Sequence, residues 1–336
     1  MEYINTKFIH ILEDEKDECF GIYGQHLHMG SWKNQLLNNL QLSKKESFGG
    51  TELLFKRISN KINLSNINLI LDTNIESQII DKSKKILYWF HNLPSDPMYK
   101  NFDKKQKIIF VSEYQKDKFI NYYNLDKENC FVIKNCIVPF PKHVKDKSIC
   151  RLIYHSTPNR GLDILIEVFS KLLPIFEKMQ INIHLDVYSS FKIYNRTDLD
   201  ECEYFQLLYE RIKNNSNMTY HGYVENEEIR QALINSNIFV YPSTYEETSC
   251  LCLIEAMSAG CICVHSSLGA LPETSNNYTY MYKYDDNKLE HCTLFAESLI
   301  KAVSNYKNIS LENQINYANN SYNLDIICEE WKKILF

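Results

Sequence analysis

The sequence lacks the basic excess with which nucleic-acid-binding proteins contact phosphates. Its 336 residues carry 37 lysines and arginines against 42 aspartates and glutamates, a formal net charge of −5. We therefore expect no nucleic-acid partner. Hydrophobic residues make up 44% and charged residues 24%, the balance of a globular protein with a sizeable core. The length favours two domains.

Long apolar runs are also missing. No run reaches the roughly 20 residues that a membrane-spanning helix needs. The amino terminus turns acidic at residues 13–18 (EDEKDE) before a long apolar stretch develops, which fits neither a signal peptide nor an anchor. Short basic runs at 84–85 and 104–107 are typical of solvated surface. We expect at most peripheral contact with a membrane.

The eleven cysteines include no CxxC pair. The closest spacings are Cys250-x-Cys252 and Cys261-x-Cys263, both within apolar runs typical of a core. Together with the lack of a signal peptide, this predicts reduced, buried thiols in a cytoplasmic protein.

Short apolar runs alternate with longer amphipathic segments along the chain, which indicates parallel sheets with helices on both faces. The runs that we predict as strands are 7–12, 67–72, 85–93, 107–112 and 130–138, then 151–156, 181–189, 218–224, 237–243 and 261–266. The segments that we predict as helices are 51–62, 115–123, 162–173, 204–213, 227–235, 250–258 and 324–336.

A break in this pattern falls at residues 139–147 (PFPKHVKDK), which are rich in proline and lysine. We interpret it as a linker between a first domain at 1–141 and a second at 148–320, followed by a terminal segment at 321–336 that can cross back to the first domain. Two doubly wound domains place a cleft between the carboxyl ends of their sheets, where ligands bind in such folds.

Gly49 and Gly50 precede the predicted helix at 51–62. Two glycines let the backbone turn tightly and approach a ligand, and the free amides at a helix start bind anions such as phosphate. A plain turn with Thr51 as the helix cap explains the pattern about equally well.

Arg160 lies between a predicted strand and the helix at 162–173. At that junction its planar guanidinium can clamp a diphosphate. The alternative is an ordinary surface arginine in a loop, and this position alone does not separate the two.

Glu247 and Glu255 are separated by seven residues, the first in the loop after a predicted strand and the second on the following helix. Glu255 shares its helix with apolar neighbours such as Leu253 and Ile254. Burying a lone carboxylate there is costly, so it needs a polar partner, and two ribose hydroxyls are suitable. The alternative is that Glu255 points to solvent and Glu247 caps the helix.

This constellation resembles glycosyltransferase family four, a group of retaining enzymes with the GT-B fold. The Glu-x7-Glu spacing carries the resemblance, with the segments EAMSAG after it and LGALPE at 268–273. Other matching segments appear in order from about residue 45 onward: FGGTE, YWFHNLP, VSEYQ, IKN, STPNRGL and YHGYV. The resemblance implies a GT-B fold of two Rossmann-like domains facing each other across a cleft.

The resemblance also implies site roles. Gly49, Gly50 and Arg160 would hold the diphosphate of a nucleotide sugar, and Glu255 would bind the ribose hydroxyls. Tyr223 and Val224 would contact the base. The donor sugar would be bound by Glu247, the amides of Thr248 and Ser249, and His91 of the first domain.

Family members transfer with retention, by a front-face attack in which the leaving diphosphate helps to deprotonate the acceptor. The protein stabilises charge on that leaving group and holds donor and acceptor together. The resemblance thus implies a UDP- or GDP-sugar donor, a glycan, lipid-linked or small-molecule hydroxyl acceptor, and no cofactor. No metal is expected, because Arg160 and helix amides would take the place of a divalent cation.

The chain departs from the family at the start of its second domain. Many members carry a Gly-Arg ahead of the second cation, whereas this chain has Tyr154-His155 there. Either His155 or Thr157 can assist the remaining Arg160. Away from the motif, His155, His184 and His265 are typical of satisfied core or rim residues.

Two other functions fit the same features. One is another GT-B enzyme, such as a sugar-nucleotide epimerase, which shares the nucleotide site but needs no acceptor. The other is a non-catalytic module that binds a nucleotide sugar. Acceptor specificity depends on the first domain, where the resemblance is thinnest.

Overall fold

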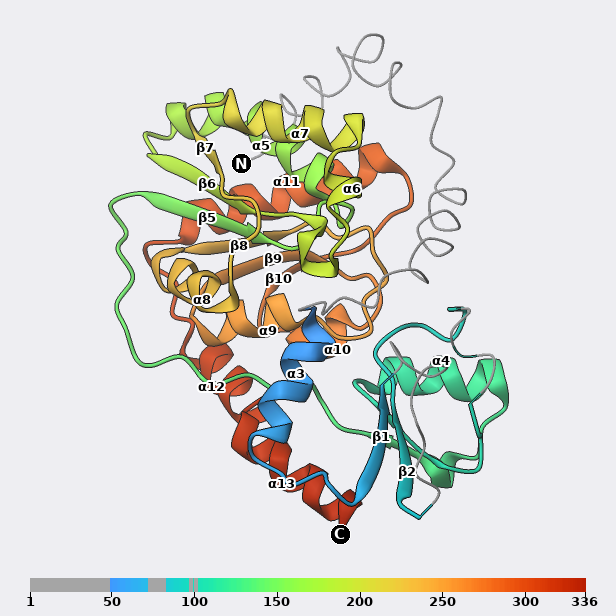
Figure 1. Cartoon of the computed structure of the whole chain (residues 1–336). Coiled ribbons are helices and arrows are strands. Elements are labelled where there is room, and N and C mark those ends of the chain that lie inside the picture. Colours follow the sequence, from blue (N-terminus) through green and yellow to red (C-terminus); the bar gives the residue numbers. More distant parts are fainter. Residues whose placement is uncertain (1–48, 72–82, 97–98, 100–101) are drawn as a thin grey trace.

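The computed structural model describes residues 49–71, 83–96, 99 and 102–336. It contains two parallel sheets, one in each half of the described chain, joined by the segment that follows β4 (Figure 1). The predicted strand at 7–12 lies outside the described residues. The linker predicted at 139–147 falls within the connection between the sheets.

The first sheet has four strands in the order β1-β2-β3-β4, every pair parallel. The strands are β1 (Ile67–Leu71), β2 (Lys85–Trp89), β3 (Lys107–Phe110) and β4 (Cys130–Val132), with helices α3 (Gly50–Ser59) and α4 (Glu113–Tyr123), and the short helix η4 (Lys127–Asn129). Ser112 caps α4, accepting a hydrogen bond from the amide of Gln115.

The second sheet has six strands in the order β10-β9-β8-β5-β6-β7, again with every pair parallel. Its strands are β5 (Cys150–His155), β6 (Ile183–Tyr188), β7 (Met218–Tyr220), β8 (Ile238–Tyr241), β9 (Ile262–Ser266) and β10 (Tyr280–Tyr282). The order reverses direction at β5, which makes the carboxyl ends of β5 and β8 a switch point of the kind where ligands bind.

Helices cover both faces of this sheet. In Figure 1, α5, α7 and α11 lie on one side of it, and α8 and α9 lie on the other. The helices of this half are α5 (Leu162–Lys178), η5 (Phe191–Tyr194), α6 (Thr197–Asp200), α7 (Glu203–Lys213), α8 (Asn226–Asn235), α9 (Leu251–Ser258), α10 (Leu271–Ser275), α11 (Lys288–Asn305) and α12 (Glu312–Ser321). Their apolar sides and the sheet form one large core.

The last helix, α13 (Leu324–Leu335), lies against α3 of the first half (Figure 1). Its buried Ile327 and Trp331 join the core cluster of the first sheet, and the Trp331 ring meets that of Trp89 edge to face at 4.9 Å. The chain therefore crosses between the halves twice, and its end completes the smaller core.

Every strand and helix expected within the described residues is present, with ends that differ by a few residues. The structure adds elements that we did not predict: β10, α6, α10, α11, α12 and the short helices η4 and η5. A signal for α11 was available: Asn287 accepts hydrogen bonds from the amides of Leu289 and Glu290 at its start, and buried residues recur along one side. No helix of the described residues is long and apolar enough to cross a membrane. The ten described cysteines are all free thiols.

His265, on β9, is a satisfied core histidine, with no exposed surface. Its Nδ1 lies 2.8 Å from the carbonyl of Ser266 and its Nε2 lies 2.8 Å from the hydroxyl of Thr279. Burial lowers the pKa of His265 from 6.5 to about 4. Between pH 6.5 and about pH 4, His265 is therefore neutral in the native state and protonated in the unfolded chain.

We expect His265 to make stability depend on pH. Its contribution is complete above about pH 6.5 and is lost as pH falls toward 4, because only the unfolded state gains the proton there. The loss between pH 7.5 and 5 should be about 2 kcal/mol. Urea titrations of the wild type and of His265→Asn at both pH values test this. Equal pH dependence in the two proteins would show that His265 does not contribute.

Candidate functional site

The candidate site lies where the carboxyl ends of the second sheet face the first half of the chain. Helices α3, α5 and α9 begin there, and none of their N-cap residues, Gly49, Gly161 and Cys250, makes a side-chain cap hydrogen bond. The first amides of a helix have no partner within the helix. Three such ends around one space favour an anionic ligand.

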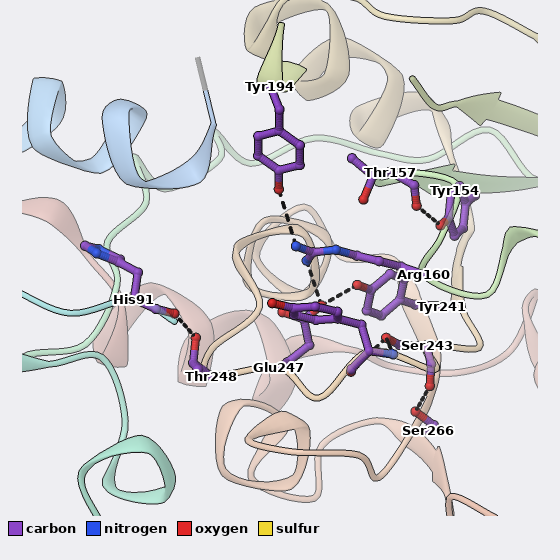
Figure 2. Close-up of polar contacts among 11 residues, drawn as sticks. His91, Tyr154, Thr157, Arg160, Tyr194, Tyr241, Ser243, Glu247, Thr248 and Ser266 are labelled. Carbon is purple, nitrogen blue, oxygen red and sulfur yellow. Dashed lines mark hydrogen bonds and ion pairs between the residues drawn. The ribbon is translucent and has the colours of Figure 1, made fainter. Parts of the chain in front are cut away.

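Arg160 and Glu247 form the centre of this site (Figure 2). The Arg160 Nη1 lies 2.8 Å from the Glu247 carboxylate, which also accepts a 2.5 Å hydrogen bond from the Tyr241 hydroxyl. The Arg160 Nη2 donates to the Tyr194 hydroxyl at 3.3 Å, and the guanidinium lies 4.4 Å from the centre of the Tyr245 ring. A partly buried cation, a carboxylate and three phenols thus converge from three separate segments.

Two glycines fix the backbone around this pair. Gly161 has a φ of +89°, and a Cβ there would lie 1.9 Å from the carbonyl oxygen of Pro242. Gly269 has a φ of +68°, and a Cβ there would lie 2.4 Å from the carbonyl oxygen of Glu247. Neither position accommodates another residue. The loop of Arg160 is therefore held tightly against β8, and the loop of Glu247 against the turn before α10.

The electrostatics of the pair follow from its burial. Burial raises the pKa of Glu247, while Arg160 and the Tyr241 hydroxyl act to lower it. Burial acts to lower the pKa of Arg160, but Glu247 outweighs it and holds that pKa above its usual value. Burial also raises the pKa of Tyr245 to about 12, so this phenol stays neutral.

Several donors remain available at the centre. The Arg160 Nε is buried and has no hydrogen-bond partner within residues 49–71, 83–96, 99 and 102–336. The amides of Thr248 and Ser249 likewise donate no hydrogen bond within the described part of the chain. Buried donors are nearly always paired in folded proteins, so unpaired donors in one site indicate where a ligand's acceptor atoms belong.

Gly49 and Gly50, at the start of α3, also lie near the Arg160 centre. A Cβ on Gly49 would lie 3.2 Å from the Tyr194 ring, whose hydroxyl contacts Arg160. A Cβ on Gly50 would meet no atom of the described residues within 4 Å. These residues therefore leave room at Gly50, in front of the first amides of α3.

The loop of Glu247 also ties the two halves together. The Thr248 hydroxyl donates to the carbonyl oxygen of His91, and the Ser112 hydroxyl donates to the carbonyl oxygen of Thr248 at 2.6 Å. Figure 2 shows the His91 imidazole pointing away from Glu247. His91 thus contacts the loop through its main chain, and a contact of its side chain with a donor sugar stays a prediction.

Glu255, on α9, is only 2% exposed and does have polar partners. Its Oε1 lies 2.8 Å from Nη2 of Arg57, on α3, and its Oε2 accepts a hydrogen bond of 3.2 Å from the side-chain amide of Asn226. The prediction that this carboxylate has a polar partner is confirmed. Arg57 was not predicted, because no local pattern connects α3 with α9.

Tyr223 and Val224 follow β7. Val224 contributes to a groove of about 380 Å³ along α8, next to the rings of Tyr188 and His221, which stack at 4.1 Å. The Tyr223 hydroxyl donates to the Glu225 carboxylate at 3.0 Å. Contact of either residue with a base stays a prediction.

His155, at the end of β5, is buried and packs on the ring of Phe239. Burial acts to lower the pKa of His155, but neighbouring Cys252, in the first turn of α9, outweighs it and raises that pKa above its usual value. Thr157 is also buried, and its carbonyl accepts from the Tyr154 hydroxyl at 2.8 Å. Both residues lie beside Arg160, and assistance to it from either stays a prediction.

Comparison with protein families gives one match. The sequence model described as glycosyl transferases group 1 matches residues 140–321, which include β5 to α12 and the Glu-x7-Glu segment. No curated protein sequence matches the chain.

Solved structures show the fold. WaaG, a glycosyltransferase involved in lipopolysaccharide biosynthesis, has a TM-score of 0.61 at 14% identity, over 88% of this chain and 98% of that chain. A glycosyltransferase from Rickettsia africae ESF-5 has a TM-score of 0.59 at 15% identity, over 87% and 83%. Anabaena Alr3699/HepE in complex with UDP has a TM-score of 0.59 at 15% identity, over 84% and 82%. The predicted GT-B fold of two parallel-sheet domains is confirmed.

Proposed function

Because the chain belongs to the glycosyl transferases group 1, we propose that it transfers a sugar from a nucleoside diphosphate sugar to a hydroxyl acceptor, with retention. The observation that carries this proposal is Arg160. Its Nε is buried without a partner among the described residues, between three helix ends whose amides are not capped by side chains. A diphosphate offers the acceptor oxygens that such donors require.

The chemistry of the proposal needs little from the side chains beyond charge and position. The bond between the sugar C1 and the diphosphate oxygen breaks, a bond between C1 and the acceptor oxygen forms on the same face, and the acceptor proton passes to the leaving diphosphate. Arg160 and the amides of Thr248 and Ser249 stabilise the developing negative charge. Glu247 fixes Arg160 and binds the donor sugar.

The rest of the donor extends from this centre. Glu255 takes the ribose hydroxyls, and the base lies against Tyr223 and Val224. Alr3699/HepE has been crystallised with UDP and with UDP-glucose, which supports a uridine donor for a protein of this fold. A guanosine donor is the alternative, since base contacts through the backbone do not depend on residue type.

The finer parts of the proposal are an acceptor of the glycan, lipid-linked or small-molecule type, transfer without a metal, and a cytoplasmic location. Arg160 and the helix ends supply the positive field that a metal would otherwise provide. The ten free thiols among the described cysteines support a reducing compartment.

A thermal-shift panel of nucleoside diphosphates and nucleotide sugars, with EDTA and then with magnesium, tests the proposal. A ligand at 100 times its dissociation constant adds about 2.7 kcal/mol to stability. We expect a clear shift with either uridine or guanosine diphosphate sugars that is the same in EDTA. The absence of a shift with every nucleotide would exclude a donor site.

Product analysis then separates the transferase from the alternatives. A transferase releases nucleoside diphosphate in step with an acceptor-linked sugar whose anomeric configuration is that of the donor. An epimerase changes the donor sugar without an acceptor, and a binding module gives no product. Anomeric inversion in the product would exclude the retaining mechanism.

Gly50→Ala should weaken nucleotide binding without lowering the stability of the protein. Within the described part of the chain, a methyl group at Gly50 meets no atom within 4 Å, and alanine is the better helix former, so the melting temperature should stay equal or rise slightly. The dissociation constant for the nucleoside diphosphate should rise about tenfold, because the methyl group stands where a phosphate approaches the amides. Calorimetric titration measures it.

Ser59→Ala, at the far end of α3, is the matched control. Its side chain only bonds back to the carbonyl of Lys56, so nucleotide binding should not change. If Gly50→Ala binds the nucleotide as well as Ser59→Ala does, the phosphate does not lie at the start of α3.

A further inference from the structure

Arg57, on α3, reaches the second half of the chain through two hydrogen bonds of its guanidinium, to Glu255 at 2.8 Å and to Asn226 at 3.1 Å. A third, of 2.9 Å, goes to the carbonyl oxygen of Cys136, which anchors the group in its own half. Side-chain exposure is 9% for Arg57 and 3% for Glu255. The ion pair is therefore buried between the two domains.

A buried carboxylate stays ionised only with a cation beside it. For Glu255 that cation is Arg57, and it bonds Oε1 alone. The other oxygen, Oε2, accepts the longer hydrogen bond of 3.2 Å from the Asn226 amide. Asn226 begins α8, two residues after Val224, and so belongs to the segment where the base is expected.

The positions of Gly50 and Arg57 along α3 match the order of phosphate and ribose in a nucleotide. Gly50 stands at the end of α3 that faces Arg160, and Arg57 lies about 10 Å further along the helix axis at 1.5 Å per residue. A nucleoside diphosphate that runs along α3 passes from its phosphates to its ribose over such a stretch.

We propose that Arg57 is a positioning residue for donor recognition: it holds Glu255 by its Oε1 and directs Oε2 to the ribose hydroxyls, which replace the Asn226 amide. This inference rests on the proposed function, in which Glu255 binds the ribose. Its consequence is that the ribose site is built by both domains. Selectivity for ribose over deoxyribose then requires a residue from the first domain, although Glu255 belongs to the second.

The experiment compares the affinity for uridine diphosphate with that for its 2′-deoxy analogue, and the guanosine pair is measured alongside. The wild type should prefer the ribonucleotide by about tenfold or more, the effect of a hydrogen bond to a charged group. Arg57→Met removes the cation and keeps an apolar stem, and its preference should fall to about twofold or less. A purely structural role would lower stability and leave this ratio unchanged.

Arg211→Met is the matched control, because Arg211 pairs with Glu167 at 2.9 Å on the outer helices of the second domain. It should keep the wild-type ratio. Arg57→Lys keeps the charge but cannot make all three hydrogen bonds, so it should give an intermediate ratio, and it serves if Arg57→Met does not fold.

The outcomes separate the two levels of the proposal. A wild type that binds no nucleotide overturns the proposed function. If the wild type binds uridine diphosphate and its 2′-deoxy analogue equally, Glu255 does not bind the ribose hydroxyls. A wild type that prefers the ribonucleotide, with an undiminished ratio in either folded Arg57 variant, overturns the positioning role of Arg57 alone.

Discussion

Glu247→Gln is expected to lower turnover at least about 100-fold while changing the dissociation constant of the nucleoside diphosphate much less. Glutamine keeps the shape of the side chain and can still accept from Arg160 and Tyr241, which bond the carboxylate at 2.8 Å and 2.5 Å. It removes the negative charge that pairs with Arg160 and that, in the proposed function, holds the donor sugar. The measurement is steady-state kinetics together with calorimetric binding of the diphosphate.

Glu246→Gln is the control for this prediction. Glu246 is the neighbouring glutamate and bonds Tyr114 and Lys118 of α4, so it has a phenol and a cation as partners outside the centre. Its replacement should change turnover only a few-fold, as expected for a partly exposed pair. Turnover of Glu247→Gln equal to that of the wild type would exclude Glu247 from the site.

Arg160→Lys is expected to lower kcat/KM about 100-fold, mostly through the diphosphate. Lysine keeps a positive charge beside buried Glu247, which avoids the loss of about 3 to 5 kcal/mol that an unpaired buried charge brings. It lacks the planar fork and the free Nε, so two phosphate contacts become at most one. The direct readout is the preference for nucleoside diphosphate over monophosphate, which should fall with the activity.

Arg151→Lys provides the comparison for Arg160→Lys. Arg151 also forms an ion pair in the second domain, with Asp186 at 2.9 Å, but it lies at the opposite end of β5. Its replacement should leave the preference for the diphosphate unchanged. If Arg160→Lys retains that preference as well, another group holds the second phosphate.

Much of the second domain was predictable from local patterns. The strands β5, β6, β8 and β9 are short apolar runs, and their fully buried positions follow from the sheet being covered on both faces. The junction of β5 with α5 placed Arg160 at the carboxyl end of a strand, which is where the structure has it. The spacing of Glu247 and Glu255 placed one in a loop and the other on α9.

The partners of these residues were not predictable in the same way. Burial of Glu255 implied a polar partner, but that partner, Arg57, is 198 residues away. The sequence predicted α3 from its apolar side and gave no sign of what Arg57 would contact. The main-chain contact of His91, whose carbonyl accepts from the Thr248 hydroxyl, had no signal in the sequence. The three tyrosines around Arg160 come from two segments, η5 and the end of β8 with its following loop, and no spacing rule connects either segment with Arg160.

The sequence by itself determined most strands and helices of the described residues and singled out Arg160, Glu247 and Glu255 as candidates, because these depend on periodicity, on glycine and cap positions, and on chemistry carried within a few residues. Its resemblance to a known family implied the GT-B architecture. Only the tertiary structure decided that Arg57 pairs with Glu255 from the other domain and that Trp331 of the last helix packs into the first core. Such contacts depend on how distant helices pack and on which direction each side chain leaves its helix, and local patterns carry neither.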